Sequence, residues 1–138
     1  MERRQFLKVF STGLIAIVSR CKADLLFYPE TPFGAIRLMP DEVPEIYKQW
    51  WREMEKCSGR KRDFSDIRWF EYPGAYVPCG DERCAETYNP ASNEIVVAKE
   101  KKMEPEYVKH GIAHALKFNH KGDRFQKGSI IYDRCGIE

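Results

Sequence analysis

The three histidines of the chain, His110, His114 and His120, lie within one short segment. His110 and His114 are four residues apart, so on an α-helix both imidazoles project from the same face, about one turn from each other. This spacing allows two nitrogens to bind one metal ion, and His120 can return after the helix as a third ligand. The histidines predict a zinc centre with three imidazole ligands and an open fourth position, as in catalytic zinc sites. The alternative is a surface helix that carries histidines without a metal.

The helix that carries these histidines is predicted to begin at Pro105 and to end near Asn119. Proline favours the first helical position, and Glu104 and Glu106 complement the positive end of the helix dipole. Gly122 follows as a residue type that ends helices. The face towards the core consists of four apolar residues at helical spacing: Val108, Ile112, Ala115 and Leu116.

The elements that must position this helix are a second helix and several strands. The second helix follows Asp41, which caps it, and ends at residues 58–59. Its apolar stripe consists of Val43, Ile46, Tyr47, Trp50, Met54 and Cys57. Trp51 falls outside this stripe. Strands are expected over residues 67–72, 75–78, 84–88 and 94–98. The pattern predicts an α+β domain with a small, mostly antiparallel sheet, an N-terminal helix and the histidine-bearing helix.

The composition indicates one globular domain without a basic binding surface. The chain has 138 residues, of which 43% are hydrophobic and 32% are charged, and a formal net charge of +2. Residues 1–21 carry four basic and one acidic side chain, so their net charge is +3 and that of the remainder is −1. This distribution argues against nucleic acid as a partner. The basic run from Arg60 to Arg62 is expected to form a solvated turn.

Residues 1–21 are predicted to be an export signal. Arg3 and Arg4 precede the apolar stretch 6–18, which is too short to span a membrane but long enough for a signal. The alternative, an amphipathic helix of the domain, is disfavoured because residues 14–18 are apolar all round. Residues 3–8 resemble the twin-arginine signal, whose pattern is two arginines, any residue and then Phe-Leu-Lys. The resemblance implies export across a bacterial inner membrane.

Cys21 closes this segment at the place where bacterial lipoproteins carry their lipidated cysteine. Arg20 stands where such signals have a small residue, so both a lipoprotein and a freely periplasmic protein remain as interpretations. Lipidation of Cys21 would anchor the domain at a membrane surface. Residues 22–40 are expected to be a linker, and residues 41–138 the folded domain.

The four remaining cysteines, Cys57, Cys79, Cys84 and Cys135, suit two disulfides in an exported chain. Three pairings are open to four cysteines. Cys79 with Cys84 is the local choice, and Cys57 would then pair with Cys135. The alternative is a zinc site at Cys79 and Cys84, which export disfavours because free thiolates do not persist in oxidising compartments.

The segment 108–116 resembles the active-site helix of zincin metallopeptidases, whose signature is His-Glu-x-x-His. Small exported bacterial zincin-like domains are similar over residues 41–125, including a helix that ends in Cys-Ser-Gly and a strand that leads to Pro-Gly. The resemblance implies a zincin-like fold. It assigns zinc binding to His110, His114 and His120.

Two positions depart from this pattern. Gly111 stands where the zincin glutamate takes a proton from the metal-bound water, and Lys117 stands where metzincins have a turning glycine. We therefore expect a catalytically degenerate homologue in which Gly111→Glu restores the base and is tolerated by the helix. One alternative is an active zinc peptidase whose base is Asp123, Glu86 or Glu94. Another is a metal-free, disulfide-stapled module that binds an unidentified protein or peptide partner.

Overall fold

The computed structural model describes residues 30–120 and 130–137. The predicted export signal with Cys21, the first part of the predicted linker and Asp123 lie outside the described residues. Within the described residues, no helix is both long and apolar enough to cross a membrane.

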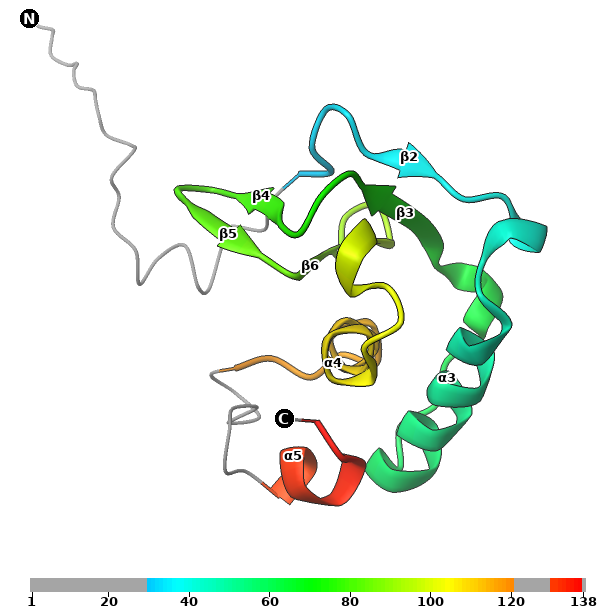
Figure 1. Cartoon of the computed structure of the whole chain (residues 1–138). Helices are drawn as coiled ribbons and strands as arrows, with labels where there is room; N and C mark the ends of the chain where they lie inside the picture. Colours follow the sequence, from blue (N-terminus) through cyan, green and yellow to red (C-terminus); the bar gives the residue numbers. More distant parts are fainter. Residues whose placement is uncertain (1–29, 121–129, 138) are drawn as a thin grey trace, which may run out of the picture.

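Six strands are described: β2 (Ile36–Arg37), β3 (Arg68–Tyr72), β4 (Val77–Cys79), β5 (Glu82–Cys84), β6 (Glu86–Asn89) and β7 (Glu94–Ala98). Four of them form a sheet in the order β2-β3-β7-β6, of which β2, β3 and β6 are labelled in Figure 1. The outer pairs of this sheet are antiparallel, and the central pair of β3 with β7 is parallel. Strands β4 and β5 form a separate antiparallel hairpin.

Strand β7 lies in the middle of the sheet and is buried on both faces. Ile95 and Val97 belong to the main hydrophobic core, whereas Val96 and Ala98 pack in a smaller cluster with Val77 of β4. This alternation follows from the opposite directions of successive side chains in a strand. The run of apolar residues, which is the strongest strand signal in the chain, therefore reflects a central strand with two covered faces.

In the described part of the chain, three α-helices pack on the face of the sheet that carries Ile95: α3 (Glu45–Ser58), α4 (Pro105–Ala115) and α5 (Ile130–Cys135). Helix α4 contacts β6, β7 and α3, and in Figure 1 it is seen along its axis, between the sheet, α3 and α5. Short 3-10 helices cover residues 40–42, 64–66 and 99–101. The α+β class, the mostly antiparallel sheet and the two principal helices of the sequence prediction are confirmed.

Several predicted element boundaries shift. Helix α3 begins at Glu45, because Asp41 belongs to a 3-10 turn and Pro44 occupies the N-cap. Residues 36–37, within the predicted linker, pair with β3, so the ordered sheet begins before residue 41. The strand expected over 84–88 is divided between β5 and β6.

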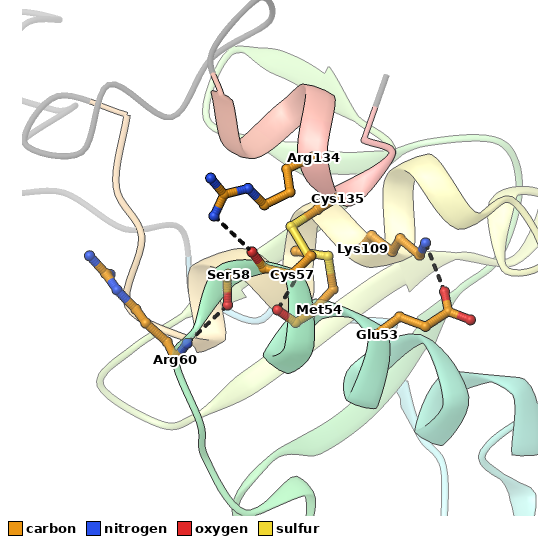
Figure 2. The surroundings of a disulfide bond; sticks show 8 residues. All are labelled: Glu53, Met54, Cys57, Ser58, Arg60, Lys109, Arg134 and Cys135. Atoms are coloured by element: carbon orange, nitrogen blue, oxygen red, sulfur yellow. Dashed lines mark hydrogen bonds and ion pairs between the residues drawn. A yellow bond between two sulfur atoms is a disulfide. The ribbon is translucent and has the colours of Figure 1, made fainter.

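Two disulfides staple the fold with the pairing favoured by the sequence. One links Cys57 at the end of α3 to Cys135 at the end of α5 (Figure 2). The other joins Cys79 to Cys84 across the β4–β5 hairpin. The alternative of a zinc site at Cys79 and Cys84 is therefore wrong, because their sulfurs are bonded to each other. Both bonds are consistent with an oxidising compartment.

Candidate metal centre

The three histidines predicted to bind metal come together. One ring nitrogen from each of His110, His114 and His120 lies within 4.8 Å of the other two. The ring centroids of His110 and His114 are 4.7 Å apart, and His120 lies 5.2 Å and 4.8 Å from them. A tetrahedral zinc ion with bonds of about 2.1 Å needs nitrogens about 3.4 Å apart. Side-chain rotations that move the nitrogens by about 1 Å would therefore bring all three to bonding distance of one ion.

The two helical histidines are held through their Nδ1 atoms. Nδ1 of His110 lies 2.6 Å from a carboxylate oxygen of Glu86, and Nδ1 of His114 lies 3.0 Å from the main-chain oxygen of Phe118. A carbonyl oxygen only accepts hydrogen bonds, so His114 donates from Nδ1 and carries its lone pair on Nε2. The same tautomer at His110 satisfies the carboxylate. Both rings thus have the orientation that metal-binding histidines adopt when a second group holds the other nitrogen.

The pKa shifts of His110 and His114 are also compatible with a bound cation. Burial lowers the pKa of His114 to about 4, so this imidazole is neutral near pH 7, the form that binds metals. Burial acts in the same direction on His110, but the charge and hydrogen bond of Glu86 outweigh it and raise the pKa of His110 above its ordinary value. Glu86 thus stabilises positive charge on this part of the site.

The third histidine reaches the site through a tight turn after α4. The helix ends at Ala115, earlier than predicted, and Lys117 adopts a left-handed conformation with φ of 78°. The N–H of Phe118 donates to the carbonyl of Ala113, and this bond closes the turn. Lys117 therefore makes the reversal that its residue type argued against, at a cost of about 1–2 kcal/mol for a residue with a side chain.

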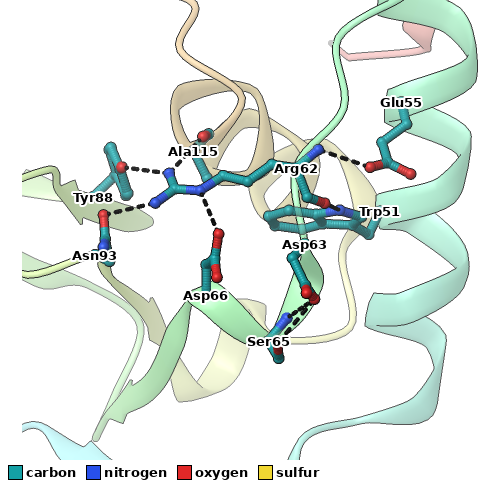
Figure 3. Close-up of polar contacts among 9 residues, drawn as sticks. All are labelled: Trp51, Glu55, Arg62, Asp63, Ser65, Asp66, Tyr88, Asn93 and Ala115. Atoms are coloured by element: carbon teal, nitrogen blue, oxygen red, sulfur yellow. Dashed lines mark hydrogen bonds and ion pairs between the residues drawn. The ribbon is translucent and has the colours of Figure 1, made fainter.

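A buried arginine supports the end of this helix. The guanidinium of Arg62 donates to the carbonyl of Ala115 at 2.9 Å, to Asn93 at 3.0 Å and to the hydroxyl of Tyr88 at 3.2 Å (Figure 3). It also pairs with Asp66 at 3.4 Å. Cations near the last carbonyls of a helix complement its dipole. Arg62 thereby connects the end of α4 to the β6–β7 hairpin.

A second arginine acts on the turn itself. Arg60 donates to the carbonyl of Lys117 at 2.8 Å, and its guanidinium lies 3.7 Å from the ring centre of Phe118. The expectation that Arg60 and Arg62 form a solvated turn is wrong, because both find acceptors within the fold. Trp51 is likewise buried, and its indole N–H donates to the carbonyl of Arg62 at 2.9 Å. These side chains tie α3 to the segment that carries His120.

Gly111 does not face an open position beside the histidines. It is buried, and a Cβ atom placed there would lie 3.0 Å from Oε1 of Glu86 and 3.3 Å from Cγ2 of Ile95. The helix propensity that favours Gly111→Glu is therefore opposed by close contacts with the sheet, and its tolerance stays a prediction. A glutamate at this position would crowd the sheet and place a second carboxylate against Glu86.

The three carboxylates named as candidate bases have different surroundings. Glu86 lies beside α4 as expected, but it binds Nδ1 of His110, on the ring edge away from Nε2. Glu94 lies at the other end of the β6–β7 pair, where it contacts Thr31 and forms an ion pair with Arg68 at 3.5 Å. Asp123 lies outside the described residues. Among the described carboxylates, only Glu86 contacts one of the three histidines.

Comparisons with protein families, with curated proteins and with solved structures found no match. The resemblance to zincins therefore stays a prediction, carried by the histidine spacing and the elements around it. What the site can do is argued below from its own residues: three convergent imidazoles, two of them oriented through Nδ1, and one buried carboxylate.

Proposed function

We propose that this chain is an exported, zincin-like domain that binds one zinc ion through His110, His114 and His120 and is a catalytically degenerate metallopeptidase homologue. The observation that carries the proposal is the convergence of three imidazoles of which two are oriented by hydrogen bonds at Nδ1. Neutral nitrogen ligands in this number match the preference of zinc. A surface helix with incidental histidines would not require either hydrogen bond.

The degenerate character rests on the absence of a placed base among the described residues. Gly111 provides no carboxylate, and the carboxylate of Glu86 is engaged with Nδ1 of His110. Loss of a general base typically lowers the rate of hydrolysis about 10²- to 10⁴-fold. A bound zinc ion would supply a Lewis-acid site with one position open to a ligand. The fourth ligand would then come from a protein or peptide partner, and the function would be binding rather than turnover.

The proposed location combines two features. The disulfides suit an oxidising compartment, and the twin-arginine pattern at residues 3–8 favours export to the periplasm, with anchoring if Cys21 is lipidated. Replacement of Arg3 and Arg4 by lysine together should trap the precursor in the cytoplasm. Fractionation followed by immunoblotting measures this, and unchanged export would point to the general secretory route.

The metal assignment is tested on the exported, oxidised protein after dialysis against zinc. We expect about one zinc per chain by elemental analysis, and loss of it in His114→Ala. The matched control is Lys109→Ala, on the same helix, since Lys109 pairs with Glu53 of α3 at 3.0 Å and not with the histidines. Wild-type protein that takes up no zinc would refute the proposal in favour of the metal-free module.

The catalytic state is tested with an unstructured protein substrate. We expect no cleavage above that of His114→Ala. Cleavage by the wild type that disappears when zinc is removed would refute the degenerate assignment and favour the active peptidase.

A further inference from the structure

Glu86 is a buried carboxylate with an unusual set of contacts. Its side chain is 9% exposed, and Oε2 lies 2.6 Å from Nδ1 of His110. Its other oxygen, Oε1, is buried and has no hydrogen-bond partner among the described residues. A buried carboxylate with so few donors is costly unless a positive charge compensates it. The group in contact with it is His110, so a cation bound by this imidazole would compensate the carboxylate.

The carboxylate of Glu86 packs closely against α4 at residue 111, which has no side chain. A Cβ at Gly111 would lie 3.0 Å from Oε1 and 3.7 Å from the carboxyl carbon of Glu86. Gly111 has ordinary helical backbone angles, since it is not among the glycines with positive φ. Its conformation therefore does not require glycine. Glycine is a poor helix former, so its presence in the middle of α4 needs another reason.

Resting on the proposed function, we infer that Glu86 is the positioning residue of the metal centre and that Gly111 is glycine to admit it. Glu86 fixes the His110 ring with Nε2 towards the ion and places one negative charge next to a dication. Neutral histidines alone leave the full charge of the ion uncompensated. Gly111, which stands where zincins have glutamate, thus leaves room for the carboxylate of Glu86 on the neighbouring strand β6.

Zinc affinity of four variants tests this inference, by competition with a chelating dye on the oxidised protein. Loss of an outer partner of a metal-bound histidine typically weakens metal binding about 10- to 100-fold. Glu86→Gln keeps an acceptor for Nδ1 but removes the charge, and we expect about 10-fold weaker binding. Glu86→Ala removes both, and we expect about 100-fold. Glu53→Gln, an exposed carboxylate on α3, is the control and should bind as the wild type does.

Gly111→Ala separates the inference from a purely structural role of the glycine. Alanine favours the helix, so a structural view predicts a variant at least as stable, with unchanged zinc affinity. The inference predicts at least 10-fold weaker binding, because the added methyl displaces Glu86. In the Glu86→Ala background the carboxylate is gone and the added methyl meets only Ile95, which binds no metal, so Gly111→Ala should have no further effect on zinc affinity. If the two substitutions lower zinc affinity additively in the double variant, Gly111 does not act through Glu86 and the inference is overturned.

The outcomes also separate this inference from the proposed function. If the wild type binds zinc and Glu86→Gln binds it equally well, the inference is wrong and the metal centre stands. If the wild type binds no zinc, the metal centre itself is wrong. Imidazole nitrogen NMR of the metal-free protein provides a readout independent of metal. We expect His110 to hold its proton on Nδ1 in the wild type and to lose this preference in Glu86→Ala, and an unchanged tautomer would overturn the positioning role.

Discussion

Helix α4 is contacted by charged side chains from two sides: from strand β6, the strand side, and from the loop after α3, the loop side. On the strand side, Glu86 follows two residues after Cys84, which closes the β4–β5 hairpin. On the loop side, Arg60 and Arg62 follow shortly after Cys57, which is bonded to α5. On each side, the charged side chains thus lie a few residues after a disulfide-bonded cysteine.

The two sides act on different parts of the helix. The strand side contacts the imidazole of His110, one of the three proposed ligands, through a carboxylate. The loop side contacts main-chain carbonyls, those of Ala115 and Lys117, where the chain turns towards His120. The strand side therefore acts on the electrostatics of the candidate metal centre, whereas the loop side sets the path of the backbone.

The largest expected effect comes from opening the disulfides one at a time. The Cys57–Cys135 bond spans a sequence separation of 78 and the Cys79–Cys84 bond one of 5. In the chain-entropy account, these loops contribute about 4 kcal/mol and about 2 kcal/mol to stability. We expect Cys57→Ser with Cys135→Ser to lower the free energy of unfolding by about twice as much as the other pair of substitutions. Urea unfolding measures both free energies. Equal losses would contradict the expectation that the loop side depends more on its disulfide than the strand side does.

The next effect compares one ligand from each side in the metal-free protein. His110→Ala leaves the carboxylate of Glu86 buried without its partner, and we expect a loss of about 3 kcal/mol in the free energy of unfolding. His120 is exposed, so His120→Ala should change this free energy by less than about 0.5 kcal/mol. Both variants should bind zinc more weakly than the wild type. A loss in His110→Ala as small as that in His120→Ala would show that Glu86 does not depend on His110.

A smaller effect is expected from Arg62→Met. The side chain of Arg62 is mostly buried, and its bonds to Ala115, Asn93 and Tyr88 are lost. We expect a loss of about 2 kcal/mol in stability, the range of hydrogen bonds made by charged groups. The control is Arg52→Met on the exposed face of α3. Arg62 holds the end of α4, after which the chain turns towards His120, so we also expect weaker zinc binding in Arg62→Met. This effect on zinc affinity should vanish in the His120→Ala background, and a persistent effect would contradict this route.

The smallest effect is expected from Arg60→Met. Arg60 is partly exposed, and its contact with the ring of Phe118 contributes about 0.5–1 kcal/mol at such a site. Thermal unfolding at two salt concentrations should show a shift that shrinks as salt increases. A loss as large as that of Arg62→Met would indicate that the turn, and not the end of the helix, is the critical contact.

Features of the sequence with local causes were predicted well. The spacing of His110 and His114, the apolar run of β7 and the local pairing of Cys79 with Cys84 each depend on residues close in the chain. Their periodicity or separation is enough to indicate the structure. The convergence of His120 with the helical pair also followed from the short distance along the chain.

Features that depend on distant pairing were missed or only partly anticipated. Glu86 was one of three candidate carboxylates, and only the β6–β7 register brings it to α4 while placing Glu94 at the far end. A charged run such as Arg60 to Arg62 has no local mark that separates a solvated turn from one whose acceptors lie on another helix. The left-handed turn at Lys117 carries no glycine to signal it.

The parallel pairing of β3 with β7 has a consequence for the order of folding. Glu94 pairs with Asn89 across a short hairpin and with Arg68 across a much longer stretch of chain. Closing the longer loop costs about 1.5 kcal/mol more entropy, so we expect the β6–β7 hairpin to form before β3 joins it. Glu86 would then be in place on its strand before α4 docks, whereas the loop side needs the whole sheet and α3. Zinc capture by a refolding chain should accordingly be a late step, and the rate at which a dye reports zinc uptake should match the slowest folding phase.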